Sequence, residues 1–420
     1  MPPAQGGSKT PALTGRRVVV GVTGSIAAYK AADFVSALVQ RGAEVRVVMT
    51  RAAQELIGPA TFRSLTGHDV ATELFEPSPK IAHVALACFG EVLAVVPATA
   101  NFLAKMAQGI ADDLLTTNVL AFRGPVVVAP AMNWRMWANA AVQENVQKLR
   151  QRGVIIVEPE EGFLACGETG RGRLARLEVL LAAIRFALRR ADLQGKPSPL
   201  AGARVLITAG PTREYIDPVR FISNASTGAM GFALAAEAAA RGAKVRVIHG
   251  PTHLAPPPDI GTVPVMTASE MAEAAFAALD DADIFIGAAA VADYAPAVTA
   301  AQKQPKSAAP LNLKLEPTVD IIAEVKKRRP ELVVVGFAAE TENVEARARE
   351  KLERKRMDMV VANEVGREKG FGQGETELTI VLVDGPSRRT GPVAKDEAAS
   401  LVIDALEDLL GARGGAFSGR

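Results

Sequence analysis

The sequence predicts an α/β protein made of two doubly wound, Rossmann-like domains with parallel sheets, and three observations support this class. Residues 16–50 read as a β-branched strand, a glycine turn, an amphipathic helix and a second strand, which is a βαβ unit. Residues 203–250 repeat the plan, and RGAKVRV at 241–247 echoes RGAEVRV at 41–47. Short apolar strands then alternate with helical patterns in both halves, which is typical of parallel sheets covered on both faces.

In the first half, the helix of the βαβ unit carries its apolar residues at Phe34, Leu38 and Val39, so this face should pack on the sheet. Three further strands are expected at LAVVPA (93–98), VVVAP (126–130) and VIIVEP (154–159). We assign residues 15–190 to this domain.

In the second half, strands are expected at DIFIGAAA (283–290), LVVVGFA (332–338) and MVVAN (359–363), within a domain of residues 203–420. The charged, proline- and glycine-containing stretch 191–202 reads as a linker, and residues 1–14 as a disordered tail.

Composition excludes several classes of protein. Two cysteines in 420 residues cannot form a disulfide framework, and 49% hydrophobic residues can fill real cores without a structural metal. No apolar stretch is long enough for a membrane span, and a formal net charge of +2 does not suit a protein that coats nucleic acid. We therefore expect a cytoplasmic protein whose partners are small molecules, neither membranes nor nucleic acids.

The turn GVTGSIAA after the first strand could bind a nucleotide. It has two glycines but lacks the third glycine of the dinucleotide fingerprint, and Thr50 stands where an NAD-binding domain carries an acidic residue. NAD is therefore disfavoured. Thr23 and Ser25 place hydroxyls beside the N–H groups of a helix start, which suits a phosphate, and PATANFLAK offers a second turn of this kind. An ordinary tight turn explains the same residues equally well.

Three polar residues of the first half draw attention. Cys166 lies between glycines and arginines in ACGETGRGR, which predicts a mobile loop; Asn133 lies in PAMNWRMW and His83 in KIAHVAL. Taken singly, each has an ordinary explanation: a spacer or redox-sensitive thiol, a turn residue, and a structural histidine. Their occurrence together favours a functional role over these ordinary explanations.

These motifs, together with GVTGSIAAYK and PATANFLAK, resemble the flavin-dependent cysteine decarboxylases, specifically the decarboxylase half of the bifunctional phosphopantothenoylcysteine decarboxylase / phosphopantothenate:cysteine ligases of coenzyme A biosynthesis. The resemblance covers nearly all of residues 15–185. It implies a flavodoxin-like flavoprotein domain in which Cys166 sits on a closing flap and His83 and Asn133 act at the substrate. It also implies FMN as cofactor, at Gly24, Ser25, Ile26, Thr50, Ala98, Thr99 and Asn101.

The implied chemistry explains why the reaction needs a flavin. Loss of CO₂ from an N-acylcysteine leaves a carbanion without an electron sink, and oxidation of the thiol to a thioaldehyde supplies one. His83 then assists the oxidation as base, Asn133 holds the substrate carboxylate, and Cys166 donates the proton that completes reduction of the enethiol.

In the second half, the loop TAGPTREYIDPVRFISNASTGAMG joins a strand to a helix over more than a dozen residues. Loops of this length are often functional, although a surface insertion is the plain alternative. Arg220 and Asn224 in it suit a carboxylate or phosphate. Lys351 and Lys355 lie four apart on a helix, where they could clamp a triphosphate or belong to a solvated charged face.

This loop, with AAAVADY, GFAAET and VVAN, resembles the ligase half of the same family across nearly all of 203–408. The resemblance implies CTP and Mg²⁺, an acyl-cytidylate of 4'-phosphopantothenate with Arg220 and Asn224 acting at it, and cysteine as the attacking amine. Sequence alone does not establish the base of the nucleotide, nor the protein ligands of Mg²⁺. The implied CTP-binding residues are Gly287, Ala288, Ala289, Asp293, Lys303, Thr318, Val319, Asp320, Ile321, Phe337, Lys351 and Lys355.

The family also implies a homo-oligomer in which flavodomain trimers are joined by ligase dimers. Two other functions compete with the bifunctional enzyme. A non-catalytic flavoprotein-fold subunit would be expected to lack one of His83, Asn133 and Cys166, but all three are present. A NAD-dependent reductase is disfavoured by the incomplete glycine fingerprint.

Overall fold

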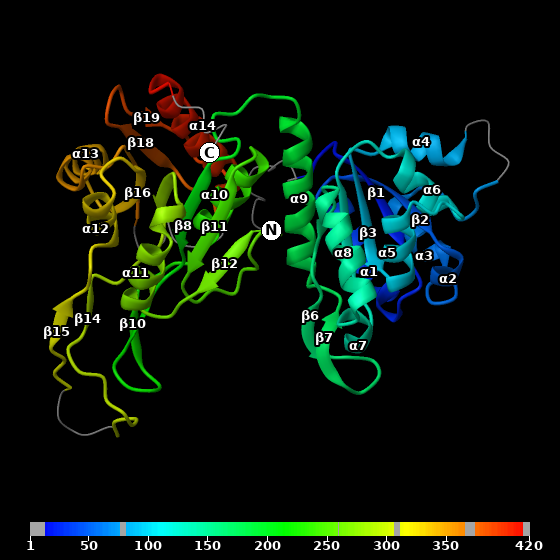
Figure 1. Cartoon of the computed structure of the whole chain (residues 1–420), viewed down its shortest axis with the longest axis horizontal. Coiled ribbons are helices and arrows are strands. Elements are labelled where there is room, and N and C mark those ends of the chain that lie inside the picture. Colours follow the sequence, from blue (N-terminus) through cyan, green and yellow to red (C-terminus); the bar gives the residue numbers. More distant parts are fainter. Residues whose placement is uncertain (1–12, 76–80, 259, 306–310, 366–373, 415–420) are drawn as a thin grey trace, which may run out of the picture. The chain divides into compact units, whose positions relative to one another are not determined.

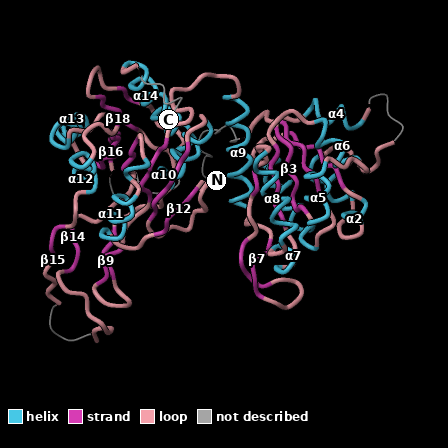
Figure 2. The backbone as a smooth tube through the Cα atoms, in the orientation of Figure 1, coloured by secondary structure: helices cyan, strands magenta, loops and turns pink. Residues whose placement is uncertain are grey.

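A computed structural model describes residues 13–75, 81–258, 260–305, 311–365 and 374–414. The chain divides into two compact units, residues 1–194 and 195–420. In each unit the strands lie at the centre and helices surround them (Figure 2). In the described part of the chain no helix has both the length and the apolarity to cross a membrane.

The first unit contains a five-stranded parallel sheet and a separate hairpin. Its strands are β1 (Arg17–Val22), β2 (Glu44–Met49), β3 (Val92–Ala98), β4 (Val126–Pro130), β5 (Ile155–Ile156), β6 (Glu160–Phe163) and β7 (Thr169–Arg173). Its helices are η1 (Ile26–Ala28), α1 (Tyr29–Gln40), α2 (Arg51–Gln54), α3 (Pro59–Thr66), α4 (Ala82–Phe89), α5 (Ala100–Gln108), α6 (Leu114–Ala121), α7 (Trp134–Trp137), α8 (Ala140–Gln151) and α9 (Leu177–Leu193). The sheet order is β2-β1-β3-β4-β5, and β6 pairs with β7 antiparallel (Figure 1).

The periodic residues behave as predicted. Phe34 and Leu38 are fully buried on the inner face of α1, whereas Val39 is only partly buried. Helices α5, α6 and α8 pack on one face of the sheet, in a cluster that includes Phe102, Leu115 and Leu149. Burial of each such side chain contributes about 1.5–3 kcal/mol, so these apolar faces hold the helices on the sheet.

The second unit has a larger, mixed sheet. Its strands are β8 (Arg204–Ala209), β9 (Arg213–Tyr215), β10 (Phe221–Ser223), β11 (Lys244–His249), β12 (Gly261–Pro264), β13 (Ile284–Gly287), β14 (Tyr294–Pro296), β15 (Leu315–Pro317), β16 (Val333–Glu340), β17 (Met359–Glu364), β18 (Leu378–Leu382) and β19 (Arg388–Arg389). Its helices are α10 (Ala229–Ala240), α11 (Ala268–Ala277), η2 (Leu279–Asp281), α12 (Ile321–Arg328), α13 (Val344–Lys355) and α14 (Lys395–Ala412).

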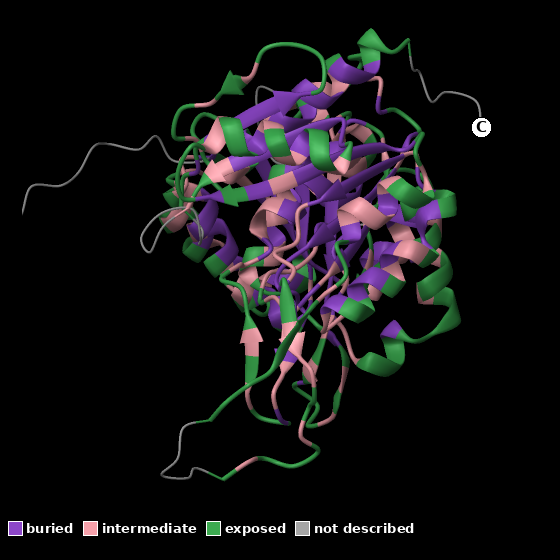
Figure 3. Ribbon diagram, turned by 90° about the vertical axis from the view of Figure 1, so that its left-hand side faces the viewer, coloured by how far each residue is buried: buried purple, intermediate pink, exposed green. Residues whose placement is uncertain are grey.

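The eight-stranded sheet of this unit has the order β12-β11-β8-β13-β16-β17-β18-β19. Its first six strands are parallel, as predicted, and two strands for which there was no expectation from the sequence extend this edge: β18 runs antiparallel to β17, and β19 runs antiparallel to β18. Helices α10 and α14 pack on one face, and α11, α12 and α13 on the other. The strands are mostly buried, and the outer faces of the helices are exposed (Figure 3).

The internal echo has a structural cause. In both copies an arginine caps the carboxyl end of the helix, and the following glycine, Gly42 or Gly242, has a positive φ of 86° or 90°. The next N–H, of Ala43 or Ala243, then donates to a helix carbonyl five residues back, at 3.1 Å in each case. This is a Schellman end, and glycine accommodates it without strain, so RGA marks the turn into the second strand.

Residues at the ends of the predicted tail and linker belong to the folded units. Leu13 is buried and its N–H donates to the Arg41 carbonyl at 2.8 Å, so the end of the expected tail belongs to the fold; residues 1–12 lie outside the described residues. Helix α9 continues to Leu193, and Leu200 is fully buried, so both ends of the expected linker at 191–202 are packed.

Candidate active sites

The residues predicted to bind a flavin gather at the carboxyl edge of the first sheet. Gly24, Ser25 and Ile26 follow β1, Thr50 follows β2, and Thr99 and Asn101 follow Ala98 at the end of β3. In a sheet of order 2-1-3-4-5 the connections diverge between β1 and β3, and ligands bind in the crevice at that point. The topology therefore brings the predicted positions to one edge.

Two hydroxyls tie these loops together. Thr23 Oγ1 donates to the Pro97 carbonyl at 2.8 Å and accepts the Thr99 N–H at 3.0 Å, while Ser25 Oγ donates to the Ala131 carbonyl at 3.0 Å. The sequence predicts that these two hydroxyls face a phosphate. In the structure both donate instead to backbone carbonyls inside the protein. A phosphate would instead meet backbone N–H groups at the starts of the following helices.

Gly24 allows a close approach in this turn. A Cβ atom at Gly24 would lie 2.5 Å from the Cβ of Ala52, so any side chain would force the β1 and β2 loops apart. Thr50 caps α2 by accepting the Ala53 N–H at 3.3 Å, and Thr99 caps α5 by accepting the Phe102 N–H at 3.2 Å. Two capped helix starts beside a narrow glycine turn fit the phosphate end of a flavin nucleotide.

The second feature is the hairpin β6–β7, whose tip carries Cys166. The sequence predicted a mobile loop here, but β6 and β7 pair from Glu160 to Arg173. Gly172 lets this hairpin lie directly on the loop after β4: its carbonyl accepts the Met132 N–H at 3.0 Å. Side chains at this position would collide with that loop, because a Cβ would lie 2.2 Å from the Met132 carbonyl oxygen.

Asn133 and Cys166, predicted to act at one substrate, do meet. The side-chain amide of Asn133 donates to Cys166 Sγ at 3.2 Å, although 33 residues separate them in the chain. Asn133 is also the N-cap of α7, since its Oδ1 accepts the Arg135 N–H at 2.8 Å. Capping fixes the side chain so that the Nδ2 group faces the hairpin.

Glu168 completes this cluster, and sequence reasoning missed it. Its carboxylate accepts the Trp134 indole N–H at 2.8 Å and pairs with Arg135 Nη2 at 2.7 Å, and the Cys166 thiol donates to it at 3.8 Å. The indole hydrogen bond, followed by the charge of Arg135, holds the pKa of the Glu168 carboxyl below its usual value. The only sequence signal was an acidic residue two positions after the cysteine.

His83 does not join this cluster within one copy of the chain. It lies on α4, at the end of the first unit away from α7 and the β6–β7 hairpin (Figure 1). Its backbone carbonyl accepts the Asn118 amide at 2.9 Å, while its buried Nδ1 has no hydrogen-bond partner among the described residues. The expectation that His83, Asn133 and Cys166 share one site is therefore not met by a single chain.

In the second unit, the long loop forms the hairpin β9–β10 and then places Asn224 against the end of β13. The Asn224 amide donates to the carbonyls of Ala290 and Val291, at 3.3 and 2.9 Å. The loop is thus fastened to the segment that follows the predicted nucleotide residues Gly287, Ala288 and Ala289.

Arg220 is less available than the sequence suggested. Its Nε and backbone N–H both donate to the fully buried carboxylate of Asp217, at 2.9 and 2.8 Å, and Nη2 donates to the Gln304 carbonyl at 2.9 Å. The Arg220 guanidinium holds the pKa of Asp217 far below its usual range. Asp217 also accepts the Gln304 N–H at 3.3 Å, so it joins the Arg220 loop to the segment of Lys303, itself exposed.

The other predicted CTP residues fall into linked groups. The Thr318 N–H donates to the Asp293 carbonyl at 2.9 Å, which joins the segment after β13 to the start of α12. Lys355 pairs with Asp320, the N-cap of α12, at 2.7 Å, and Lys351 pairs with the buried Glu340 at 2.5 Å. Both amines therefore face carboxylates, and a shared clamp on one ligand is not formed. Val319 is exposed and Ile321 is buried.

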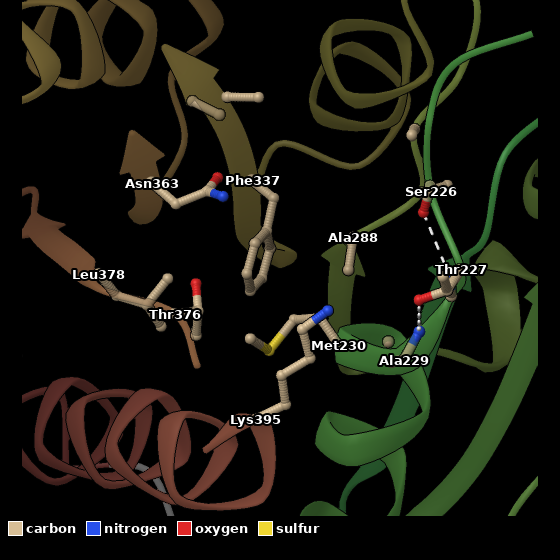
Figure 4. Close-up of a pocket in the computed structure, with 16 residues that line it drawn as sticks. Ser226, Thr227, Ala229, Met230, Ala288, Phe337, Asn363, Thr376, Leu378 and Lys395 are labelled. Carbon is tan, nitrogen blue, oxygen red and sulfur yellow. Dashed lines mark hydrogen bonds between the residues drawn. The ribbon is translucent and has the colours of Figure 1, made fainter. Parts of the chain in front are cut away.

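A cavity of about 140 Å³ lies near the carboxyl ends of β13, β16 and β17. Ala288, Ala289 and Phe337, all predicted CTP residues, line it (Figure 4). Sequence reasoning quoted STGAMG and VVAN but did not assign Ser226, Thr227 or Asn363, and it missed Thr376 and Lys395 altogether. Burial lowers the pKa of the Lys395 amine, which points into the cavity (Figure 4).

Among the described residues, no group of three or more His, Cys, Asp or Glu side chains is placed to hold a metal ion.

The fold and the two sites define a class: a two-domain α/β protein with a flavodoxin-like domain that carries a thiol hairpin, followed by a second α/β domain with a cavity at the carboxyl ends of its strands. The flavoprotein family model matches residues 7–188, and the model of the DNA/pantothenate metabolism flavoprotein C-terminal domain matches residues 200–410.

Curated relatives narrow the class. The coenzyme A biosynthesis bifunctional protein CoaBC of Bacillus subtilis (strain 168) is 43% identical over 403 residues, which are 94% of this chain and 98% of that protein. CoaBC of Escherichia coli (strain K12) is 43% identical over 383 residues, 89% of this chain and 92% of that protein. The chain belongs to the family of CoaBC bifunctional proteins of coenzyme A biosynthesis, and it combines a decarboxylase half with a ligase half.

Solved structures were also found for each half. The C-terminal domain of a CoaBC protein is 38% identical and covers 51% of this chain and 99% of that chain, with a TM-score of 0.45. The FMN-dependent cysteine decarboxylase SpaF is 42% identical and covers 43% of this chain and 99% of that chain, with a TM-score of 0.39.

Proposed function

We propose that the second unit ligates cysteine to 4'-phosphopantothenate and that the first unit decarboxylates the resulting 4'-phosphopantothenoylcysteine to 4'-phosphopantetheine. The observation that carries this proposal is the contact between Asn133 and Cys166 on a hairpin in the unit whose sheet edge fits a flavin. A carboxylate-binding amide beside a thiol matches the two groups that an N-acylcysteine substrate requires.

FMN is the proposed cofactor of the first unit. It would be held by the loops after β1, β2 and β3 through Gly24, Ser25, Ile26, Thr50, Ala98, Thr99 and Asn101. When bound, FMN accepts two electrons from the substrate thiol and returns them after CO₂ has left. The protein does the remaining work: Asn133 donates to the substrate carboxylate, and Cys166 supplies a proton from the tip of the hairpin.

CTP and Mg²⁺ are proposed for the second unit, which turns the 4'-phosphopantothenate carboxylate into an acyl-cytidylate with release of pyrophosphate. The amine of cysteine then displaces CMP. We place the nucleotide along Gly287 to Ala289, Phe337 and the start of α12. The Lys355–Asp320 pair is partly exposed, and ion pairs near the surface contribute little, about 1 kcal/mol or less, so this amine can exchange its carboxylate for a phosphate.

The position of His83 supports the proposal of a homo-oligomer. Because His83 lies apart from Cys166 within one chain, a neighbouring copy would have to supply the histidine to each site, which supports flavodomain trimers. Exposed apolar residues flank α4, among them Phe75 and Ile81, which are 91% and 65% exposed. We propose that ligase dimers join these trimers and that the protein is cytoplasmic.

The deciding experiment incubates the protein with 4'-phosphopantothenate, cysteine, CTP and Mg²⁺ and analyses the products by mass. We expect 4'-phosphopantetheine, CMP and pyrophosphate, and a yellow protein with flavin absorption. A Cys166→Ser variant should release CO₂ but accumulate a product two hydrogens lighter. Normal 4'-phosphopantetheine from this variant at the wild-type rate would show that Cys166 is not the proton donor.

A second experiment separates the halves. Residues 1–190 alone should bind FMN and decarboxylate, and residues 200–420 alone should ligate without flavin, because each half has its own sheet and core. Ligation by the second fragment that depended on added FMN would contradict this division.

A further inference from the structure

We propose that Glu168 is the positioning residue of the decarboxylase: its carboxylate orients the Cys166 thiol and holds the β6–β7 hairpin on α7, so that the thiol proton reaches the substrate carbon. This inference rests on the proposed role of Cys166 as proton donor. It assigns a function to the acidic side chain that contacts the thiol in the described part of the chain.

The contacts around Glu168 define its task. One carboxylate oxygen accepts the Trp134 indole N–H at 2.8 Å and also the thiol at 3.8 Å, and the other accepts Arg135 Nη2 at 2.7 Å. Trp134 and Arg135 are the first two residues of α7, directly after Asn133. Glu168 therefore fastens the tip of the hairpin to the helix that positions the substrate-binding amide.

The thiol is oriented from both sides. Asn133 Nδ2 donates to Cys166 Sγ at 3.2 Å, and the thiol donates to Glu168, so the sulfur has one acceptor and one donor role. When a substrate carboxylate takes the Asn133 amide, Glu168 alone continues to hold the thiol. A hydrogen bond to an ionised carboxylate requires the thiol to carry its proton, and the Trp134 and Arg135 contacts keep Glu168 ionised.

The proton transfer balances without a further reactant. In the last step the S–H bond of Cys166 breaks, a C–H bond forms at the carbon that lost CO₂, and the sulfur keeps the electron pair. The two electrons that reduce the neighbouring carbon come from the proposed FMN cofactor. Glu168 neither gains nor loses a proton, so its effect is confined to the geometry of this step.

The test compares Glu168→Ala with Glu161→Ala in the full-length, flavin-loaded protein. Glu161 lies on β6 of the same hairpin and is exposed, so its substitution removes the same charge without touching the thiol. With 4'-phosphopantothenoylcysteine as substrate, we expect CO₂ release by Glu168→Ala within about threefold of wild type. The rate of full reduction should fall by about 10-fold to 100-fold, the range for displacement of a reacting group by up to about 1 Å. The product two hydrogens lighter than 4'-phosphopantetheine should accumulate, as it should not in Glu161→Ala.

Other outcomes separate the explanations. If Glu168→Ala gives only normal product at the wild-type rate while Cys166→Ser accumulates the lighter product, Glu168 has no positioning role and the proposed function stands. If Glu168→Ala lowers CO₂ release and reduction equally and raises KM, Glu168 merely holds the hairpin, and the proposal is wrong. Normal product from Cys166→Ser would overturn the proton-donor assignment itself. Should Glu168→Ala lose its flavin, Glu168→Leu, which has a similar size but cannot accept a hydrogen bond from the thiol, replaces it with the same expected partial product.

Discussion

Replacement of Gly172 by alanine should disable decarboxylation while leaving ligation intact. Gly172 lies on β7, where its carbonyl accepts the Met132 N–H at 3.0 Å. An added Cβ would lie 2.2 Å from the Met132 carbonyl oxygen and 3.2 Å from the Trp134 N atom. Both neighbours are backbone atoms of the loop that presents Asn133, so no side-chain rotation can relieve the collision.

The size of the effect follows from that distance. A carbon and a carbonyl oxygen approach to about 3.3 Å in favourable contacts, so the hairpin and the Asn133 loop must separate by about 1 Å. Displacement of a reacting group by about 1 Å costs on the order of 100-fold in rate. We therefore expect CO₂ release from 4'-phosphopantothenoylcysteine to fall about 100-fold in Gly172→Ala, because the collision displaces the loop that presents the Asn133 amide to the substrate carboxylate.

The assay measures single-turnover CO₂ release, with ligation of cysteine to 4'-phosphopantothenate as an internal reference. Gly162→Ala is the matched control: it lies on β6 of the same hairpin, and its Cβ would meet only the flexible side chain of Arg173, at 3.4 Å. Equal activity of both variants would refute the reasoning, and so would a Gly172→Ala protein with normal flavin content, an unchanged melting temperature and a wild-type rate.

Three further predictions concern both units. Asn224→Asp should lower the rate of ligation by about 100-fold and leave decarboxylation unchanged, because a carboxylate cannot donate to the Ala290 and Val291 carbonyls. The rate of pyrophosphate release measures ligation. A parallel loss of both activities would contradict this prediction. Asp217 has a pKa depressed by Arg220, so its stabilising effect is present above the unfolded-state pKa of about 3.9 and is lost as pH falls towards the lower folded pKa. Between about pH 5 and pH 3, urea unfolding should show a smaller loss of stability in Asp217→Asn than in wild type, and parallel pH curves would exclude this linkage. Removal of FMN should lower the melting temperature of the first unit alone, since a ligand at 100 times its Kd adds about 2.7 kcal/mol to the free energy of unfolding of the domain that binds it. An equal shift of both units in calorimetry would argue against separate domains.

Much of the fold could be predicted because the signals are local. The spacing of Phe34 and Leu38 defines the buried face of α1 from five consecutive residues. The repeated RGA turn marks two helix ends through one glycine each. The direction of β18 gave no such signal, since a buried apolar strand reads the same whichever way its neighbour runs, and β19 consists of only two exposed arginines.

The β6–β7 hairpin was read as a mobile loop for a similar reason. Its strands are EEGF and TGRGR, which contain no apolar alternation and few β-branched residues. Such a segment forms strands only because a neighbouring surface accepts it, here through Gly170 and Gly172 against the loop of Trp134. Propensity cannot anticipate a pairing that tertiary contacts impose.

The sequence by itself determined which residue types are present and at which strand ends they lie: a glycine turn after β1, a capped turn after β3, and the polar residues Asn133 and Cys166 in separate loops. Only the tertiary structure decided which of these meet. It joins Asn133 to Cys166, gives the thiol a carboxylate in Glu168, and separates His83 from both within one chain. The physical reason is that periodicity and capping act over a few residues, whereas contacts between loops depend on strand order and on how closely glycines let two backbones approach.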